Sequence, residues 1–193
     1  MKGLNRMTKI KSICVYCGAS DDVAPGYIKL AEELGRELAR RDIRMVYGGG
    51  GIGLMGACAR AAHESAGDVL GIMPRFLLSK EMIYEEVEHR IVDDMHTRKQ
   101  MMFDESEAFI VLPGGIGTLE EAVEILSWAR LGLHAKPMAF LDEDGFWYPF
   151  FELMEHIIDG GFTPDAFRSA LVHCDTPKSA VDALMDKMIV LGE

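Results

Sequence analysis

The residues with the clearest chemical potential lie in the segment Leu112–Glu121, which reads Leu-Pro-Gly-Gly-Ile-Gly-Thr-Leu-Glu-Glu. An apolar run, Ala108–Leu112, precedes it, and an amphipathic helical pattern, Leu119–Leu131, follows it. A glycine loop between a strand and a helix presents backbone N–H groups and the positive end of the helix dipole to an anion. Glu121 follows Thr118 by three residues, so both lie on nearly the same helix face. The segment therefore predicts a phosphate cradle with a carboxylate close by, and we interpret it as the core of an active site.

The loop lacks the lysine of a nucleoside-triphosphate-binding loop, because the pattern G-x-x-x-x-G-K-[ST] does not occur in the chain. The sequence therefore predicts a monophosphate held by backbone amides and Thr118. Arg98 and Lys99 are adjacent cations just upstream of the strand that feeds the loop. Such a pair is ordinarily solvated surface charge, but near a phosphate loop an arginine offers a planar fork to an anion.

A second glycine element, Gly51-Ile-Gly53-Leu-Met-Gly56, has the spacing G-x-G-x-x-G of a dinucleotide fingerprint. It follows the second predicted strand rather than the first. The next strand, Val69–Met73, ends without the acidic residue that would hold a ribose 2′-OH, although Arg75 leaves a phosphorylated dinucleotide open. A classical dinucleotide site is therefore disfavoured. Close strand–helix packing and a loop that contributes to a nucleotide pocket both remain open.

Cys14 and Cys17 form a C-x-x-C, which could indicate redox or metal chemistry. They lie in or at the end of a strand-like run, Ile10–Tyr16, where residues three apart point to opposite faces. The chain has no second C-x-x-C, and its six histidines show no ligand spacing. We therefore expect buried strand thiols and no metal site.

The chain has 193 residues, of which 49% are hydrophobic and 26% charged, as in an ordinary globular domain. This length predicts a single domain over residues 1–193, with Met1–Lys9 as a loose extension. A net charge of −11 argues against general binding to nucleic acid or to an anionic membrane. We find no apolar run long enough for a transmembrane helix and no signal-peptide pattern, and so expect a cytoplasmic protein.

Short apolar strands alternate with helical patterns along the chain. The predicted strands are Ile10–Tyr16, Arg44–Tyr47, Val69–Met73, Glu88–Val92, Ala108–Leu112, Pro137–Leu141 and Leu171–Cys174. The predicted helices are Tyr27–Arg41, Leu54–Ala66, Met95–Glu105, Leu119–Leu131, Phe146–Gly160 and Pro177–Leu191. This order is typical of an α/β, doubly wound (Rossmann-like) fold, with a mostly parallel sheet and helices on both faces.

With these elements in place, the chain resembles the LOG family of cytokinin riboside 5′-monophosphate phosphoribohydrolases, which also carry the label "lysine decarboxylase family". The family pattern P-G-G-x-G-T-x-x-E matches Pro113–Glu121 without a gap. The pattern M-H-x-R-K matches Met95–Lys99, and G-G-G-x-x-G-L-M-G matches the run that ends in Gly53–Gly56. The resemblance extends from about Ile10 to the carboxyl end.

The resemblance implies hydrolysis of the N-glycosidic bond of an N6-modified AMP, which gives a free adenine-type base and ribose 5-phosphate, with no cofactor. It also implies a homodimer. It places Arg98 and Glu121 in catalysis. The residues that it places in substrate binding are Glu81, Arg98, Lys99, Gly114, Gly115, Ile116, Gly117, Thr118, Leu119, Glu120, Glu121 and Ser127.

The chemical roles stay open at this point. Cleavage of a glycosidic bond passes through a transition state that is positive at C1′, and Glu121 could stabilise that charge, orient the ribose hydroxyls or activate water. Arg98 could hold the phosphate or assist departure of the base. Glu120 and Glu124, four residues apart on the helix, are expected to face solvent rather than the reaction.

Two other classes of protein compete with this interpretation. A non-catalytic nucleotide-binding or sensing module would use the same glycine loops and keep Glu121 only as a favourable charge at a helix start. An amino-acid decarboxylase would need pyridoxal phosphate on a lysine, and nothing in the sequence around Lys99 or Lys136 favours such a site.

Overall fold

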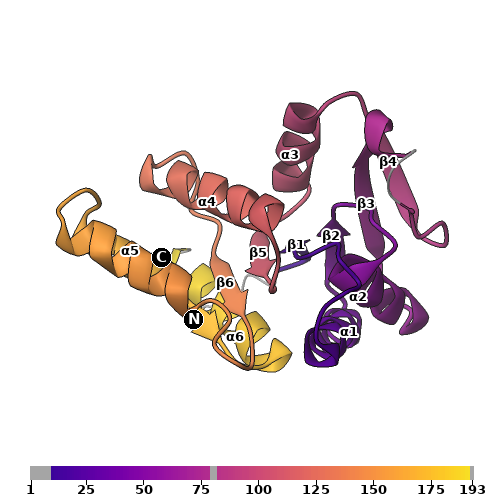
Figure 1. The fold of residues 1–193 in the computed structure, drawn as a ribbon, viewed down its shortest axis with the longest axis horizontal. Coiled ribbons are helices and arrows are strands. Elements are labelled where there is room, and N and C mark those ends of the chain that lie inside the picture. Colours follow the sequence, from indigo (N-terminus) through magenta and orange to yellow (C-terminus); the bar gives the residue numbers. More distant parts are fainter. Residues whose placement is uncertain (1–9, 79–81, 192–193) are drawn as a thin grey trace, which may run out of the picture.

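The structure, a computed structural model, describes residues 10–78 and 82–191 (Figure 1). The strands are β1 (Ser12–Tyr16), β2 (Arg44–Tyr47), β3 (Val69–Pro74), β4 (Glu88–Val92), β5 (Ala108–Val111), β6 (Met138–Leu141) and β7 (His173–Cys174). The α-helices are α1 (Pro25–Arg40), α2 (Gly53–Glu64), α3 (Met95–Asp104), α4 (Ile116–Arg130), α5 (Tyr148–Asp159) and α6 (Pro177–Leu191). None of these described helices is both long and apolar enough to cross a membrane.

The described strands form one sheet of seven strands in the order β4-β3-β2-β1-β5-β6-β7, and all six neighbouring pairs are parallel. The chain moves outward from β1 to β4 and then returns to the other side of β1 with β5. The pair β1–β5 is therefore the switch point of a doubly wound sheet, beside which such folds bind their ligands. This topology confirms the predicted fold class.

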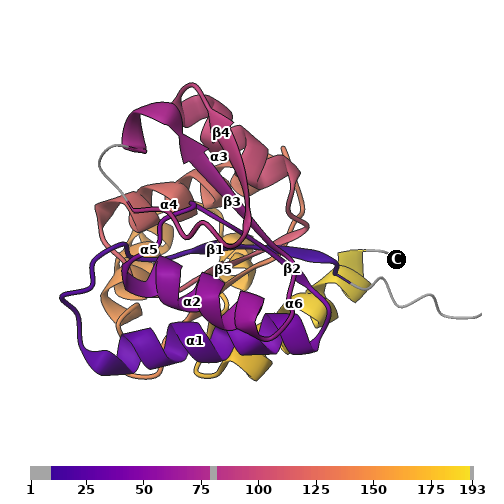
Figure 2. The same ribbon diagram turned by 90° about the vertical axis from the view of Figure 1, so that its right-hand side faces the viewer.

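Helices cover both faces of the sheet (Figures 1 and 2). The core on one face joins alternate residues of β1 to apolar residues of α1, α2 and α6. The core on the other face joins the remaining residues of β1 to α3, α4 and α5. Cys17 belongs to the first core and Cys14 to the second, and both thiols are free and buried. The expected opposite orientation of these cysteines is confirmed.

Each predicted strand and helix has a counterpart, and the ends differ by a few residues. The largest shift that concerns the site is the start of α4, which is Ile116 rather than Leu119. The N–H of Leu119 already donates to the carbonyl of Gly115, at 3.0 Å, so the first helical turn includes Gly117. The expected extension Met1–Lys9 lies outside the described residues.

Candidate active site

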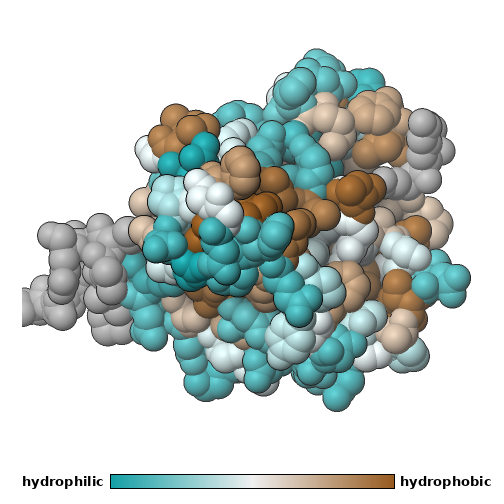
Figure 3. Space-filling model, turned by 60° about the vertical axis from the view of Figure 1, so that its left-hand side comes forward, coloured by the Kyte–Doolittle hydropathy of each residue, from teal (hydrophilic) through white to brown (hydrophobic). Residues whose placement is uncertain are grey.

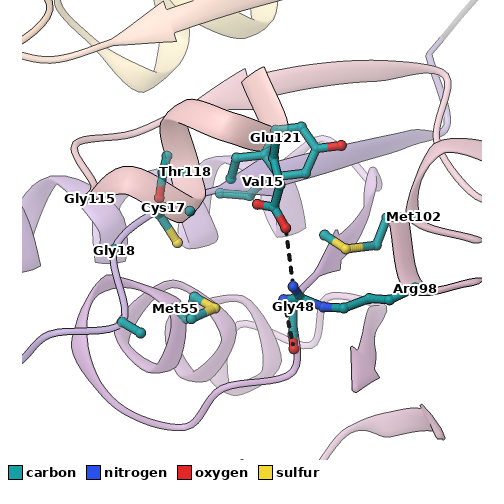
Figure 4. A pocket seen from close by; sticks show the side chains of 13 residues that line it. Val15, Cys17, Gly18, Gly48, Met55, Arg98, Met102, Gly115, Thr118 and Glu121 are labelled. Atoms are coloured by element: carbon teal, nitrogen blue, oxygen red, sulfur yellow. Dashed lines mark hydrogen bonds and ion pairs between the residues drawn. The ribbon is translucent and has the colours of Figure 1, made fainter. Parts of the chain in front are cut away.

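A cavity of about 200 Å³ lies at the carboxyl ends of the central strands. Its walls come from the end of β1 and the loop after it, from the loop after β2, and from α2, α3 and the first turns of α4 (Figure 4). Segments far apart in the sequence meet here because the carboxyl ends of parallel strands share one edge of the sheet. The cavity thus lies beside the β1–β5 switch point.

Arg98 crosses the cavity from α3 toward Glu121 and Gly48 (Figure 4), and three partners hold it. Its Nε donates to the carbonyl of Ile72 at 3.1 Å, Nη2 donates to the carbonyl of Gly48 at 3.4 Å, and Nη1 donates to Oε1 of Glu121 at 3.2 Å. A Cβ atom at Gly48 would lie 2.1 Å from Nη2, so only glycine leaves room for this guanidinium. Asp94 caps the start of α3 through the N–H of Thr97, at 2.8 Å. The cap sets the turn from which Arg98 projects.

Glu121 lies opposite Arg98 on α4, and only 12% of its side chain is exposed. Burial raises the pKa of Glu121 from 4.5 to about 7, because water no longer stabilises the carboxylate. Arg98 opposes this rise in pKa and the negative charge of Glu120 adds to it. Near neutral pH the protonated and ionised forms of Glu121 are therefore both populated, which suits a group in acid–base chemistry.

The amino end of α4 forms the other wall of the cavity. Gly115 and Gly117 line it together with the buried Thr118, and no side chain caps this helix start. The first N–H groups of the helix are therefore available to an anion. Gly114 lies directly behind, where an added Cβ would be 2.2 Å from the hydroxyl oxygen of Thr118. The glycine thus lets the loop pass close to the threonine side chain.

The structure brings together only part of the predicted site. The predicted residues that line the cavity are Arg98, Gly115, Gly117, Thr118 and Glu121. Ile116 is 83% exposed, and Ser127 is also exposed, on the outer side of α4. Glu81 lies outside the described residues. The predicted roles of Gly114, Ile116, Leu119, Glu120 and Ser127, none of which lines the cavity, stay predictions.

Lys99 differs from the expected arrangement, because it does not join Arg98 at the cavity. Its Nζ donates to Glu120 at 2.7 Å and to Glu124 at 2.9 Å, across the groove between α3 and α4. Glu120 and Glu124, expected to face solvent, are thus the partners of this lysine, and Glu124 is only 25% exposed. In this chain the cation beside the glycine loop is Arg98, and no lysine is among the described residues that line the cavity.

Two cavity residues were not predicted to line a site. Tyr16 comes from the end of β1 and Met102 from α3. The only available signal was their position, since residues at the carboxyl ends of parallel strands converge. The sequence left open whether the second glycine element serves close packing or a nucleotide pocket. In the structure the segment around it does both, because Gly48 and Met55 line the cavity and its glycines pack closely on their neighbours.

The fold and the cavity define a doubly wound α/β protein with an anion-binding helix start beside a buried arginine–carboxyl pair. Comparison with known proteins agrees with this class. The family model described as "Possible lysine decarboxylase" matches residues 55–184. Cytokinin riboside 5′-monophosphate phosphoribohydrolase LOG3 of Arabidopsis thaliana is 43% identical over 178 residues, which cover 92% of this chain and 83% of the relative.

The LOG phosphoribohydrolase of Oryza sativa subsp. japonica is 42% identical over 177 residues, covering 91% of this chain and 73% of the relative. The chain therefore belongs to the LOG family.

Among solved structures, the molybdenum cofactor binding protein of Rippkaea orientalis has a TM-score of 0.69 at 20% identity, and the alignment covers 95% of this chain and 99% of that one. The Moco carrier protein of Chlamydomonas reinhardtii gives the same TM-score, identity and coverage. At such low identity these two structures support the fold alone.

Proposed function

We propose that this protein is a cytokinin riboside 5′-monophosphate phosphoribohydrolase, the activity named for its relatives in two plants. It cleaves the N-glycosidic bond of an N6-modified adenosine 5′-monophosphate and releases the free base and ribose 5-phosphate. The observation that carries this proposal is the buried Arg98–Glu121 pair, 3.2 Å apart, facing the anion-binding start of α4 in one cavity.

The phosphate of the substrate binds at the start of α4. The free N–H groups of the first helical turn and the hydroxyl of Thr118 supply donors, and the helix dipole favours the negative charge. This placement directs the ribose toward Glu121, one helical turn further along the same face. AMP itself carries the same phosphate and ribose, and we propose that it also binds here.

In the reaction the bond between C1′ and the base nitrogen breaks, and positive charge develops at the ribose. The carboxylate of Glu121 stabilises this charge. Water then adds its oxygen to C1′. One hydrogen of that water ends on the nitrogen that left C1′ and the other stays on the new hydroxyl, so the products are the neutral free base and ribose 5-phosphate. No group beyond water and the substrate is consumed.

Arg98 can serve both the carboxylate and the substrate. A guanidinium has five N–H groups, and the partners found among the described residues occupy three of them. The remaining two are free to donate to the phosphate, the ribose or the departing base. Because two backbone carbonyls anchor the guanidinium, its orientation is set before the substrate arrives.

The experiment that tests this function is a substrate panel read out by released base. N6-isopentenyl-AMP and AMP should yield free base, and the unphosphorylated riboside should yield little, because it lacks the group that the helix start binds. Arg98→Met and Glu121→Gln should lower kcat by about a hundredfold or more while the folded structure persists. Glu152→Gln, at an exposed position of α5 away from the cavity, should stay within about twofold of the wild type and serves as the matched control.

Two results would overturn the proposal. Wild-type rates in both Arg98→Met and Glu121→Gln would refute the assignment of the catalytic pair. Tight binding of AMP with no ribose 5-phosphate from any member of the panel would instead identify a non-catalytic nucleotide-binding module.

We also propose that the protein acts as a homodimer through the outer face of α4. Ile116, Val123 and Leu131 lie on this face and are 83%, 44% and 60% exposed. Figure 3 shows hydrophobic side chains exposed on the side of the molecule that carries α4 and α5. Ser127 shares the α4 face, so it can reach a substrate only in the cavity of a partner subunit. A cytoplasmic location stays a prediction from the sequence.

A further inference from the structure

A second cavity, of about 410 Å³, lies at the opposite end of the sheet from the candidate active site. It opens between α4, the start of β6, the segment after α5 and α6, and we call it the basal cavity. Most of its lining is apolar, and the residues that matter to the argument are Ile125, Leu126, Pro137, Met138, Lys136 and Lys187. Its size falls within the range of small-molecule sites, roughly 300–1,000 Å³.

Two lysines line this apolar space, and in the part of the chain that the structure describes neither is paired with a carboxylate. Nζ of Lys136 donates to the carbonyl of Phe103 at 2.6 Å and lies 3.6 Å from the centre of the Phe103 ring. Nζ of Lys187 donates to the carbonyl of Ser169. Among the described residues neither lysine has an ion-pair partner within 4.0 Å, although Lys99 and Lys178 both do. Asp104 and Glu107 act on Lys136 only from beyond that distance.

Burial destabilises the charged forms of Lys136 and Lys187. It lowers the pKa of both Lys136 and Lys187, because each ammonium group has lost part of its water. Two partly buried cations beside apolar walls are stabilised by an anion that also fills the apolar volume. The chain as a whole carries a net charge of −11, so a local excess of positive charge is a specific feature of this cavity.

His134, which also lines the cavity, adds no further charge. The backbone N–H of Lys136 donates to Nδ1 of His134 at 3.1 Å, so Nδ1 has no proton. Nε2 therefore carries the proton and donates to the carbonyl of Ile125 at 2.9 Å. Burial lowers the pKa of His134, which keeps the ring neutral. The charged groups among the described lining residues are thus the two lysines alone.

We propose that the basal cavity is a binding site for a small monocarboxylate with an apolar body, separate from the site of glycosidic cleavage. The carboxylate accepts hydrogen bonds from Nζ of Lys136 and Nζ of Lys187. The apolar body lies against Ile125, Leu126 and Met138. The carboxylate of the ligand gives the two lysines a negatively charged partner. Its apolar body and the apolar wall of the cavity are both removed from contact with water.

The test is a calorimetric titration of the full chain with octanoate at pH 7.5, with 1-octanol as the uncharged analogue. The wild-type protein should bind one octanoate, and its Tm should rise with octanoate concentration, since the ligand binds the folded state. Lys136→Met and Lys187→Met should each weaken binding by about tenfold or more, the effect of losing a charged hydrogen-bond donor. 1-Octanol should bind at least about tenfold more weakly than octanoate for the same reason.

Lys178→Met is the matched control, because this lysine lies on the same helix as Lys187 but is exposed and paired with Asp182. It should bind octanoate as the wild type does. If Lys136→Met destabilises the fold because the Lys136–Phe103 contact is lost, Lys187→Met still tests the proposal. The proposal is overturned if millimolar octanoate does not bind, if both lysine variants in the cavity bind it like the wild type, or if 1-octanol binds equally well.

Discussion

At the scale of single residues, the site depends on an arginine that cannot move and a carboxyl group that titrates near neutrality. Carbonyl groups from β3 and from the loop after β2 fix the guanidinium of Arg98. Glu121 faces it from α4, with a pKa raised to about 7 by burial. The protonation state of Glu121 therefore decides whether the cavity holds a neutral pair or a lone positive charge.

This pKa predicts how activity depends on pH. As pH rises through about 7, Glu121 loses its proton, and the carboxylate that stabilises a positive C1′ becomes available. We expect kcat/KM to rise by about tenfold per pH unit below this value and to level off above it. The measurement is release of base from N6-isopentenyl-AMP between about pH 5 and pH 9.

The phosphate of the substrate titrates near pH 6, so a midpoint there would report the substrate rather than Glu121. A rate that falls as pH rises through 7 would contradict the proposed role of the carboxylate. It would indicate instead that the protonated form of Glu121 is the active one.

At the scale of elements, the contact between Arg98 and Glu121 depends on the distance between α3 and α4. Lys99 of α3 binds Glu120 and Glu124 of α4 on the side of these helices away from the cavity. This network ties together the two helices that carry Arg98 and Glu121. We therefore interpret Lys99 as a residue that holds the helices in register, and its predicted contact with substrate is a separate hypothesis.

A double-mutant cycle separates these two roles of Lys99. If it ties α3 to α4, Lys99→Met and the pair Glu120→Gln with Glu124→Gln should each destabilise the fold by about 1 kcal/mol, and their effects should not add. Thermal unfolding of the single and combined variants measures this. A variant Lys99→Met with wild-type stability and a strongly raised KM would show that the lysine serves the substrate instead.

At the scale of the whole molecule, the doubly wound order of strands places the cavity. The neighbouring strands β1 and β5 are followed by connections that lead to opposite halves of the sheet, toward β2 and β6, so the loops after them separate and leave space at the carboxyl ends of the two strands. The outer face of α4 then runs from this cavity along the surface, with apolar residues that no described part of the chain covers. The proposed dimer would bury that face.

A charge placed on this face tests the proposed dimer. Val123→Glu should convert the dimer into a monomer, because association would bury an unpaired carboxylate. Analytical ultracentrifugation measures the change in mass, and base release should fall if Ser127 of a partner subunit contributes to the site. Ile91→Glu, at an exposed position of β4, is the control. A wild-type protein that is monomeric and fully active at assay concentration would refute the proposal.

The amino-acid sequence was enough to predict the helices, the strands and the class of fold. Short runs of β-branched and apolar residues predicted most of the strands, and apolar residues at helical spacing predicted helices such as Tyr27–Arg41. The segment Leu112–Glu121 predicted the glycine loop and the carboxylate because those features depend on neighbours in the chain. Even there the start of α4 was placed three residues late, since glycine after a proline usually indicates a loop.

Which of these residues meet in space depends on how the helices and strands pack. Arg98 and Lys99 are adjacent in sequence, but on a helix they point about 100° apart, and the packing of α3 on the sheet selects Arg98 for the cavity. Tyr16 and Met102 reach it from other elements, which no local pattern could indicate. The pKa of Glu121 likewise depends on burial by distant segments. Local chemistry was readable from the sequence, whereas proximity and loss of water required the folded chain.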